Sequence, residues 1–237
     1  MRRLSIGIGV AFFVAAILRL VDQLNLVATP PTLPETTNLV DRVLGTITYR
    51  NDIWPVFFGT NLLVALGFAG IAALGWLLAA RMTATDDRRG WLLGTFVTGG
   101  ILGTAGQLVL LGAVKAQIDI PYCDCGFKQQ EIVSQVWAEM VAQGASQWLV
   151  DGALFLGAIG LALAALRFGG REMPDAWSWL SLGIAVLVGA WLVLTFVNVA
   201  SDVTDVILLL TIGILVPIWS IWLGLRFGHT QPVGQPS

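Results

Sequence analysis

Residues 54–80 read WPVFFGTNLLVALGFAGIAALGWLLAA, a stretch without a charged residue. A helix needs about 20 predominantly apolar residues to cross a bilayer, so this stretch predicts a membrane-spanning helix. Five further stretches meet the same requirement, and tryptophans mark several of their ends, as expected at the level of the lipid headgroups. The six predicted spans cover residues 4–27, 54–80, 91–114, 148–166, 177–200 and 205–227.

The composition of the 237-residue chain agrees with this prediction. Hydrophobic residues make up 56% and charged residues 12%, about half of the charged fraction of an average soluble domain. Such a chain cannot cover a globular surface with polar groups, which excludes a soluble enzyme, and its hydrophobicity excludes a disordered chain. The net charge of −2 offers no basic surface for nucleic acid. We therefore predict an all-α, polytopic membrane protein, with a six-helix transmembrane domain over residues 1–228 and a polar tail over residues 229–237.

The positively charged residues of the loops predict the orientation, because cytoplasmic loops carry an excess of Lys and Arg. The side that holds both termini carries Arg2, Arg3, Arg81, Arg88, Arg89, Arg167, Arg171 and Arg226, and the other side carries Arg42, Arg50, Lys115 and Lys128. We predict a multi-pass protein of the bacterial inner (plasma) membrane with both termini in the cytoplasm. An alternative for the first span is a cleaved signal peptide, with a basic start at Arg2 and Arg3 and a cleavage site near Ala28.

Both long outer loops contain an amphipathic pattern. Apolar residues recur at helical spacing over residues 39–47 and again over residues 132–141. We predict two short amphipathic helices that lie flat on the outer surface or cap the bundle. Each pattern precedes a span that opens with a tryptophan, Trp54 or Trp148. Spans one and two would therefore form one unit, and spans three and four a second, related unit. The alternative is that such helices resemble each other by chance.

Polar side chains gather in the outer halves of the spans. Ionisable residues within a span are costly and usually face the bundle interior or a wet cavity. We therefore predict a polar pocket that is open to the outer side, with Asp151 paired to Arg19 or Lys115 of another span. Its predicted ligand-binding residues are Arg19, Asp22, Asn61, Gln107, Asp151 and Asn198. The alternative is that these groups hold the helices together, or extend to the interfacial water, and bind nothing.

Glycine and proline predict how two of the spans pack. Gly99, Gly103 and Gly106 lie on one face of the third span, where they let a neighbouring backbone approach closely. We predict that this span is the central packing helix within one chain rather than a dimer interface. Pro217 has no N–H to donate, so it predicts a kink of the last span near Gly213.

The second outer loop contains Cys123 and Cys125, which are separated by one residue. A strained, redox-active disulfide, a Cu(I) site on two thiolates and a purely structural link are the alternatives. No Met-rich or His-rich stretch accompanies the pair, so we favour the structural link.

Several segments together resemble a known family. Residues 37–80 read as a capped helix, the turn Tyr49-Arg50 and a span, residues 173–177 (MPDAW) open a later span, and residues 219–224 (WSIWLG) end the last one. In this order the chain resembles a DUF4386-like, uncharacterised six-helix family of bacterial membrane proteins, known only as a domain of unknown function. The resemblance implies six spans and supplies no activity or site residue, and the cysteine loop departs from it.

Three functions of different classes fit these patterns. The first is binding or transport of a small or amphiphilic ligand, a lipid included, in the outer pocket. The second is a membrane subunit or scaffold that binds a partner membrane protein through its outer loops. The third is an extracytoplasmic thiol redox or Cu(I) site at Cys123 and Cys125. The chain shows no phosphate-binding loop, nucleophile triad or paired carboxylates, so we expect a non-enzyme without catalytic residues, metal ion or cofactor, surrounded by membrane lipids.

Overall fold

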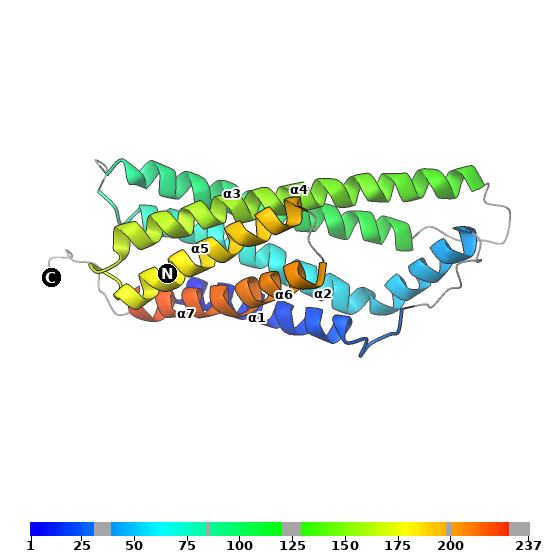
Figure 1. The fold of residues 1–237 in the computed structure, drawn as a ribbon, viewed down its shortest axis with the longest axis horizontal. Coiled ribbons are helices and arrows are strands. Elements are labelled where there is room, and N and C mark those ends of the chain that lie inside the picture. Colours follow the sequence, from blue (N-terminus) through cyan, green and yellow to red (C-terminus); the bar gives the residue numbers. More distant parts are fainter. Residues whose placement is uncertain (31–38, 84–85, 120–128, 198–200, 228–237) are drawn as a thin grey trace.

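The computed structural model describes residues 1–30, 39–83, 86–119, 129–197 and 201–227, which form an all-α bundle (Figure 1). Within these ranges, six helices are long and apolar enough to cross a membrane, which confirms the predicted fold class. The elements are α1 (Arg2–Gln23), α2 (Leu39–Ala79), α3 (Arg88–Ile118), α4 (Gln129–Phe168), α5 (Asp175–Phe196), α6 (Ser201–Leu210), η1 (Thr211–Leu215) and α7 (Val216–Phe227). The last three follow one another without a break and form the sixth span.

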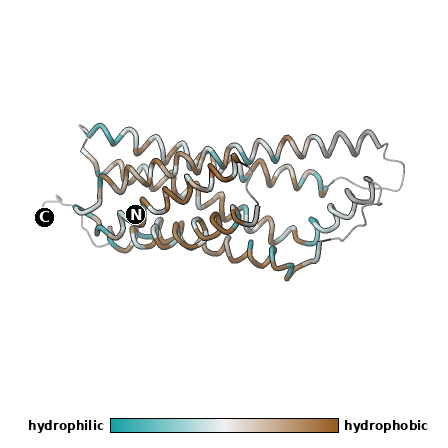
Figure 2. Tube along the Cα trace, in the orientation of Figure 1, coloured by the Kyte–Doolittle hydropathy of each residue, from teal (hydrophilic) through white to brown (hydrophobic). Residues whose placement is uncertain are grey.

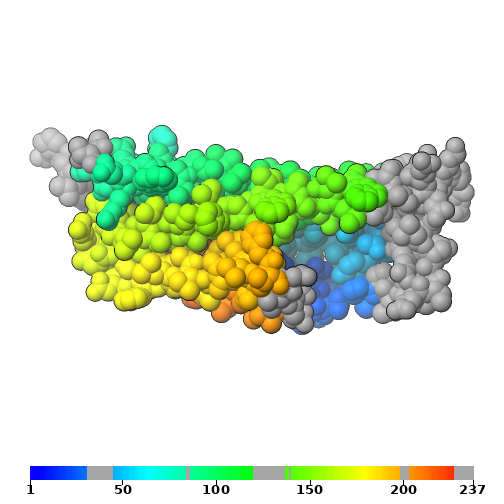
Figure 3. All heavy atoms as spheres, turned by 45° about the horizontal axis from the view of Figure 1, so that its top comes forward, coloured from blue at the N-terminus to red at the C-terminus, as the bar shows by residue number. Residues whose placement is uncertain are grey.

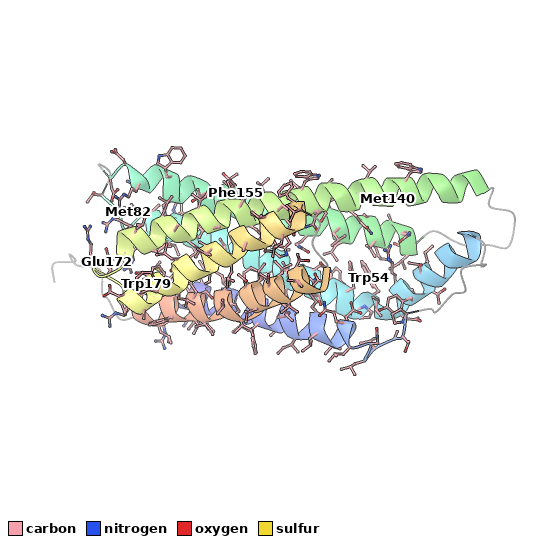
Figure 4. The ribbon with its side chains drawn as sticks, viewed as in Figure 1. Trp54, Met82, Met140, Phe155, Glu172 and Trp179 are labelled. Atoms are coloured by element: carbon pink, nitrogen blue, oxygen red, sulfur yellow. The ribbon has the colours of Figure 1, made fainter. Side chains whose placement is uncertain are left out.

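The start of α1 and the end of α7 lie at the same end of the bundle (Figure 1). We call this the inner end and the opposite end the outer end, following the predicted orientation. Figure 2 shows hydrophobic residues along the length that the spans share and hydrophilic residues toward both ends. In Figure 4, Glu172 and Trp179 lie toward the inner end, and Trp54 and Met140 lie toward the outer end.

α3 packs closely between α2 and α4 and does not occupy the centre of the bundle, where the prediction of a central packing helix places it. Its most extensive contacts are with α2 and α4, while α1 packs against α2 and α7, and α5 packs against α4. Glycines allow this approach: an added Cβ at Gly100 would lie 2.5 Å from the carbonyl oxygen of Phe68 on α2, and one at Gly99 would lie 3.1 Å from a backbone oxygen of α4. Thr104 Oγ1 also donates to the carbonyl oxygen of Ala65 on α2, at 3.2 Å. The glycines of α3 therefore serve contacts within the chain.

α2 and α4 are much longer than a membrane span. They contain 41 and 40 residues, or about 60 Å each at the rise of an α-helix, against a hydrocarbon layer of about 30 Å. The two amphipathic helices of the outer loops are present, but they continue into α2 and α4 and project past the ends of α1 and α5 instead of lying flat (Figure 1). Helical structure continues on both sides of Pro55, because a proline removes one hydrogen bond without forcing the chain to stop. The repeat of span pairs stays a prediction.

The sixth span contains an irregularity at the place that Pro217 predicts. Residues Thr211–Leu215 are π-helical, and the Val216 N–H donates to the carbonyl oxygen of Thr211. Pro217 cannot donate the next hydrogen bond of the series. Four residues earlier, Gly213 packs so closely on α1 that an added Cβ would lie 2.6 Å from Ala16 Cβ. The proline and this close contact account for the wider turn, a feature that often occurs at functional sites.

An aromatic stack closes the inner half of the bundle. Trp219 lies between Trp177 and Phe96, with ring centroids 5.5 Å and 6.4 Å apart, and all three side chains are buried. Trp219 Nε1 donates to Ser181 Oγ at 2.8 Å, so its one donor is satisfied. The stack joins α3, α5 and α7 and fills the space between them.

Ion pairs join the end of α4 to the loops before α3 and after α4 at the inner end. Arg167 Nε donates to Asp86 Oδ2 at 2.9 Å, and Arg167 Nη1 lies 3.9 Å from Glu172 Oε1. Partial desolvation raises the pKa of Asp86, but the hydrogen bonds from the Arg88 backbone N–H and from Arg167, together with both positive charges, outweigh it and lower that pKa below its usual value. The carboxylate of Asp86 is therefore held in its charged form.

Candidate functional site

A cavity of about 560 Å³ lies in the outer half of the bundle. All six spans contribute to its wall, which includes parts of α1 between residues 12 and 23, of α2 between 57 and 68, of α4 between 146 and 154, and of the sixth span between 204 and 213. Its volume lies within the range of ligand pockets, about 300–1,000 Å³. Figure 3 shows a recess on this part of the surface, beside the green atoms of α4, with blue atoms at its depth.

The floor of the cavity is apolar and largely aromatic. It includes Phe12, Phe68, Leu154 and Trp191. The rings of Phe12 and Phe68 meet edge to face, with centroids 5.7 Å apart. Two glycines make room for them: an added Cβ at Gly67 would lie 2.7 Å from the Phe12 ring, and one at Gly103 would lie 2.4 Å from the Phe68 ring. The floor therefore depends on glycine at both positions.

Above the floor, α2 and α3 contribute polar side chains to the wall. They are Thr60, Asn61 and Gln107. Asn61 Nδ2 donates to the carbonyl oxygen of Phe57 at 2.7 Å. Thr60 Oγ1 and Gln107 Oε1 are buried and have no hydrogen-bond partner in the described part of the chain. A buried polar atom without a partner costs roughly 1–3 kcal/mol, so either side chain would gain by turning this atom toward a bound hydroxyl or amine.

Charged side chains form a rim at the outer end of the cavity. Arg19 Nη2 and Asp205 Oδ1 lie 3.5 Å apart and join α1 to α6, with both side chains about half exposed. Tyr49 Oη donates to Asp22 Oδ1 at 3.5 Å, a long hydrogen bond between the outer part of α2 and the end of α1. The rim thus combines one guanidinium and two carboxylates, all three of which line the cavity.

The cavity brings together four of the residues predicted to bind a ligand, namely Arg19, Asp22, Asn61 and Gln107. Asp151 is not part of the wall. Asn198 lies outside the described residues, and so do Cys123 and Cys125. The predicted thiol site therefore stays a prediction.

Asp151 has neither the position nor the partner that we expected. Its carboxylate accepts a hydrogen bond from Gln147 Nε2 of the same helix at 2.7 Å, whereas Arg19 pairs with Asp205 of α6 and Lys115 pairs with Asp119, the residue that follows α3. α4 lines the cavity with the face that holds Val150. Asp151 follows one residue later, about 100° around the helix from Val150, and lies at the edge of this face beside Gln147.

The predicted set of ligand-binding residues lacks the apolar floor and several polar residues of the wall, among them Thr60, Ser146, Gln147, Thr204 and Asp205. Helical spacing offers a signal for part of the floor. Phe12, Ala16, Arg19 and Gln23 follow one another at i, i+4, i+7 and i+11, so all four share the face of α1 that holds Arg19. The same signal is weak elsewhere, because the other spans are apolar on every side.

In the described ranges, no three His, Cys, Asp or Glu side chains lie close enough together to hold a metal ion. The cavity residues offer recognition instead: hydrogen-bond acceptors and charges above an apolar floor. Comparison of the chain with known protein families, curated proteins and solved structures gives no match. The family resemblance described above therefore stays a prediction, and the function has to be argued from the cavity.

Proposed function

We propose that the protein binds a small or amphiphilic ligand that enters the cavity from the outer side of the membrane. The observation that carries the proposal is a cavity of about 560 Å³ with two buried, unpartnered polar atoms, Thr60 Oγ1 and Gln107 Oε1, in its wall. Protein interiors are otherwise close-packed, and polar groups that only hold helices together pair with one another. A ligand would fill the space, and a rotation of the Thr60 and Gln107 side chains toward it would form the missing hydrogen bonds.

Transport of the bound ligand would require one conformational change in addition to binding. The stack of Phe96, Trp177 and Trp219 closes the inner half of the bundle, as we would expect in a transporter that is open to the outer side. Passage of a ligand would require α7 to move Trp219 out of the stack. The π-helical turn Thr211–Leu215 directly precedes α7 and in part lines the cavity, so it is where that movement would occur.

A cavity-narrowing variant tests the proposal. The full chain is extracted from its own membrane in mild detergent and analysed by native mass spectrometry. We expect a retained small molecule or lipid whose occupancy falls strongly in Leu110→Trp, because Leu110 lines the cavity. The matched control is Leu108→Trp on the same helix, since Leu108 is 51% exposed and its replacement leaves the cavity unchanged. No retained molecule in the wild type, or equal occupancy in both variants, would refute the proposal.

A second candidate function, binding of a partner membrane protein, is favoured by an apolar strip on α4. Trp137, Met140 and Val141 are 63%, 59% and 66% exposed. They precede Trp148, whose ring lies 6.1 Å from that of Phe196 at the end of α5, so the strip projects beyond the level at which α5 ends. Exposed apolar patches of this kind often mark interaction sites.

The strip makes a separate prediction. We expect a second protein chain to co-purify with the wild type in mild detergent and to be lost from Trp137→Gln, while Trp179→Gln at the inner end, 73% exposed, retains it. A monodisperse monomer in all three preparations would refute this function and leave the cavity proposal intact.

A further inference from the structure

We infer that the ligand of the cavity is a single-chain amphiphile with a protonated amine head, whose head lies at the rim near Asp22 and whose alkyl chain lies on Phe12 and Phe68. The inference rests on the proposed binding function and names the class of ligand. Four features of the cavity lead to it: its gradient of polarity, the charge of its rim, its unpartnered acceptors and its opening.

The polarity of the cavity changes along the bundle axis. On α1 the wall extends from Phe12 to Asp22, about 15 Å at the rise of an α-helix. It is apolar at the deep end and charged at the outer end, which is the order found in a lipid of the outer leaflet. A ligand that is polar throughout would be desolvated against the floor, and a wholly apolar ligand would leave the Gln107 oxygen without a partner.

The rim has a surplus of negative charge. Arg19 is already paired with Asp205 at 3.5 Å, while the carboxylate of Asp22 accepts one long hydrogen bond from Tyr49, at 3.5 Å. A positively charged head would place its charge next to Asp22. A negatively charged head would lie among two carboxylates and would have to displace Asp205 from Arg19.

The unpartnered atoms favour a head that carries N–H groups. Gln107 Oε1 is an acceptor, and Thr60 Oγ1 accepts as well as donates. A protonated primary amine has three N–H donors, whereas a quaternary ammonium has none. A primary amine therefore matches the charge of the rim and carries the donors that the acceptors of the wall lack.

The cavity opens toward the side of the bundle. α1 ends at Gln23 and α5 ends at Phe196, whereas α4 continues past them at the outer end (Figure 1). The recess in Figure 3 lies in this place, beside α4. An amphiphile of the outer leaflet can thus reach the floor with its chain while its head stays at the level of the headgroups.

Probes that differ in head or chain test the inference. Binding to the full chain in lipid nanodiscs is measured with dodecylammonium, butylammonium and dodecanoate. We expect dodecylammonium to bind about tenfold more tightly than either of the others. Asp22→Asn should weaken its binding about tenfold, or about 1.4 kcal/mol, and Asp22→Glu should retain it. The control Asp52→Asn alters an exposed carboxylate of α2 and should leave the affinity unchanged.

The position of the chain is read from Trp191, which lies at the floor. A dodecylammonium with bromine at the end of its chain should quench tryptophan fluorescence, and Trp191→Phe should remove that part of the quenching. Quenching that is unaffected by Trp191→Phe would overturn the proposed orientation.

The outcomes separate the ligand class from the binding function. Equal affinity for dodecanoate, or an unchanged affinity in Asp22→Asn, overturns the positively charged head, and equal affinity for butylammonium overturns the alkyl chain. Each of these results leaves the binding function standing as long as the retained molecule responds to Leu110→Trp. A retained molecule whose occupancy is unchanged in Leu110→Trp would refute the binding function itself.

Discussion

Replacing Gly100 by alanine tests the helix packing that holds the cavity wall together. The added Cβ would lie 2.5 Å from the carbonyl oxygen of Phe68 and 2.6 Å and 2.8 Å from Cβ and N of Ala72, all on α2. Two of these three atoms belong to the backbone, so α2 and α3 would have to move apart. Overpacking of this kind costs about 1–3 kcal/mol, while alanine in place of glycine stabilises a helix by about 1 kcal/mol.

Gly112 provides the matched control. It lies on the same helix, and an added Cβ there would meet no atom within 4 Å. The gain in helix propensity is similar at both positions and cancels when the two variants are compared. We therefore expect Gly100→Ala to be about 1–3 kcal/mol less stable than Gly112→Ala.

The comparison can be made by reversible unfolding in mixed micelles of a mild detergent and dodecyl sulfate, followed by tryptophan fluorescence. Both variants are measured beside the wild type, so that the free energy of unfolding is read at the same micelle composition. Equal stability of the two variants would show that α2 and α3 do not approach each other as closely as the structure has them.

Two further predictions concern the inner half of the bundle. Because the pKa of Asp86 is lowered in the folded protein, its stabilising effect is present above the unfolded pKa of about 3.9 and is lost as the pH falls through the folded value. We therefore expect the melting temperatures of the wild type and of Arg167→Gln to converge below that folded pKa. Curves of melting temperature against pH that stay parallel would refute the ion pair. Ser181→Ala leaves the buried Trp219 Nε1 without its acceptor and should cost about 1–3 kcal/mol, whereas Ser178→Ala removes a hydroxyl that has no partner in the described residues and should cost less in the same unfolding assay; the reverse order would contradict the assigned hydrogen bond.

The spans could be predicted from the sequence because a lipid environment allows few solutions. A chain in the hydrocarbon layer has to satisfy its backbone hydrogen bonds internally, so a long apolar stretch is a helix. The predicted span 177–200 corresponds to α5 (Asp175–Phe196). The continuity of α2 through Pro55 could not be predicted, since the sequence there has a tryptophan followed by a proline, and these residues usually mark the start of a new helix.

The sequence predicts how deep in the membrane each site residue lies, but not the direction in which its side chain points. The distance of a residue from the end of its span determines its depth, and for this reason Arg19, Asn61 and Gln107 lie at similar depth in one cavity. Direction depends on how each helix is rotated against its neighbours. Asp151 has a suitable depth, but α4 faces the cavity with Val150, one residue earlier. A single sequence contains no information on that rotation when a span is apolar on all sides.

Accessibility of the cavity to water on the outer side is the most direct test of the central claim. In a chain whose Cys123 and Cys125 are replaced by serine, Asn61→Cys places a thiol in the cavity wall, and Ser181→Cys places one in the closed inner half, where Ser181 is 0% exposed. A membrane-impermeant maleimide is added to intact cells. We predict that the thiol at position 61 is labelled from outside and that the thiol at position 181 is not. Labelling of position 61 from the cytoplasmic side alone, or at neither side, would contradict an outward-open cavity.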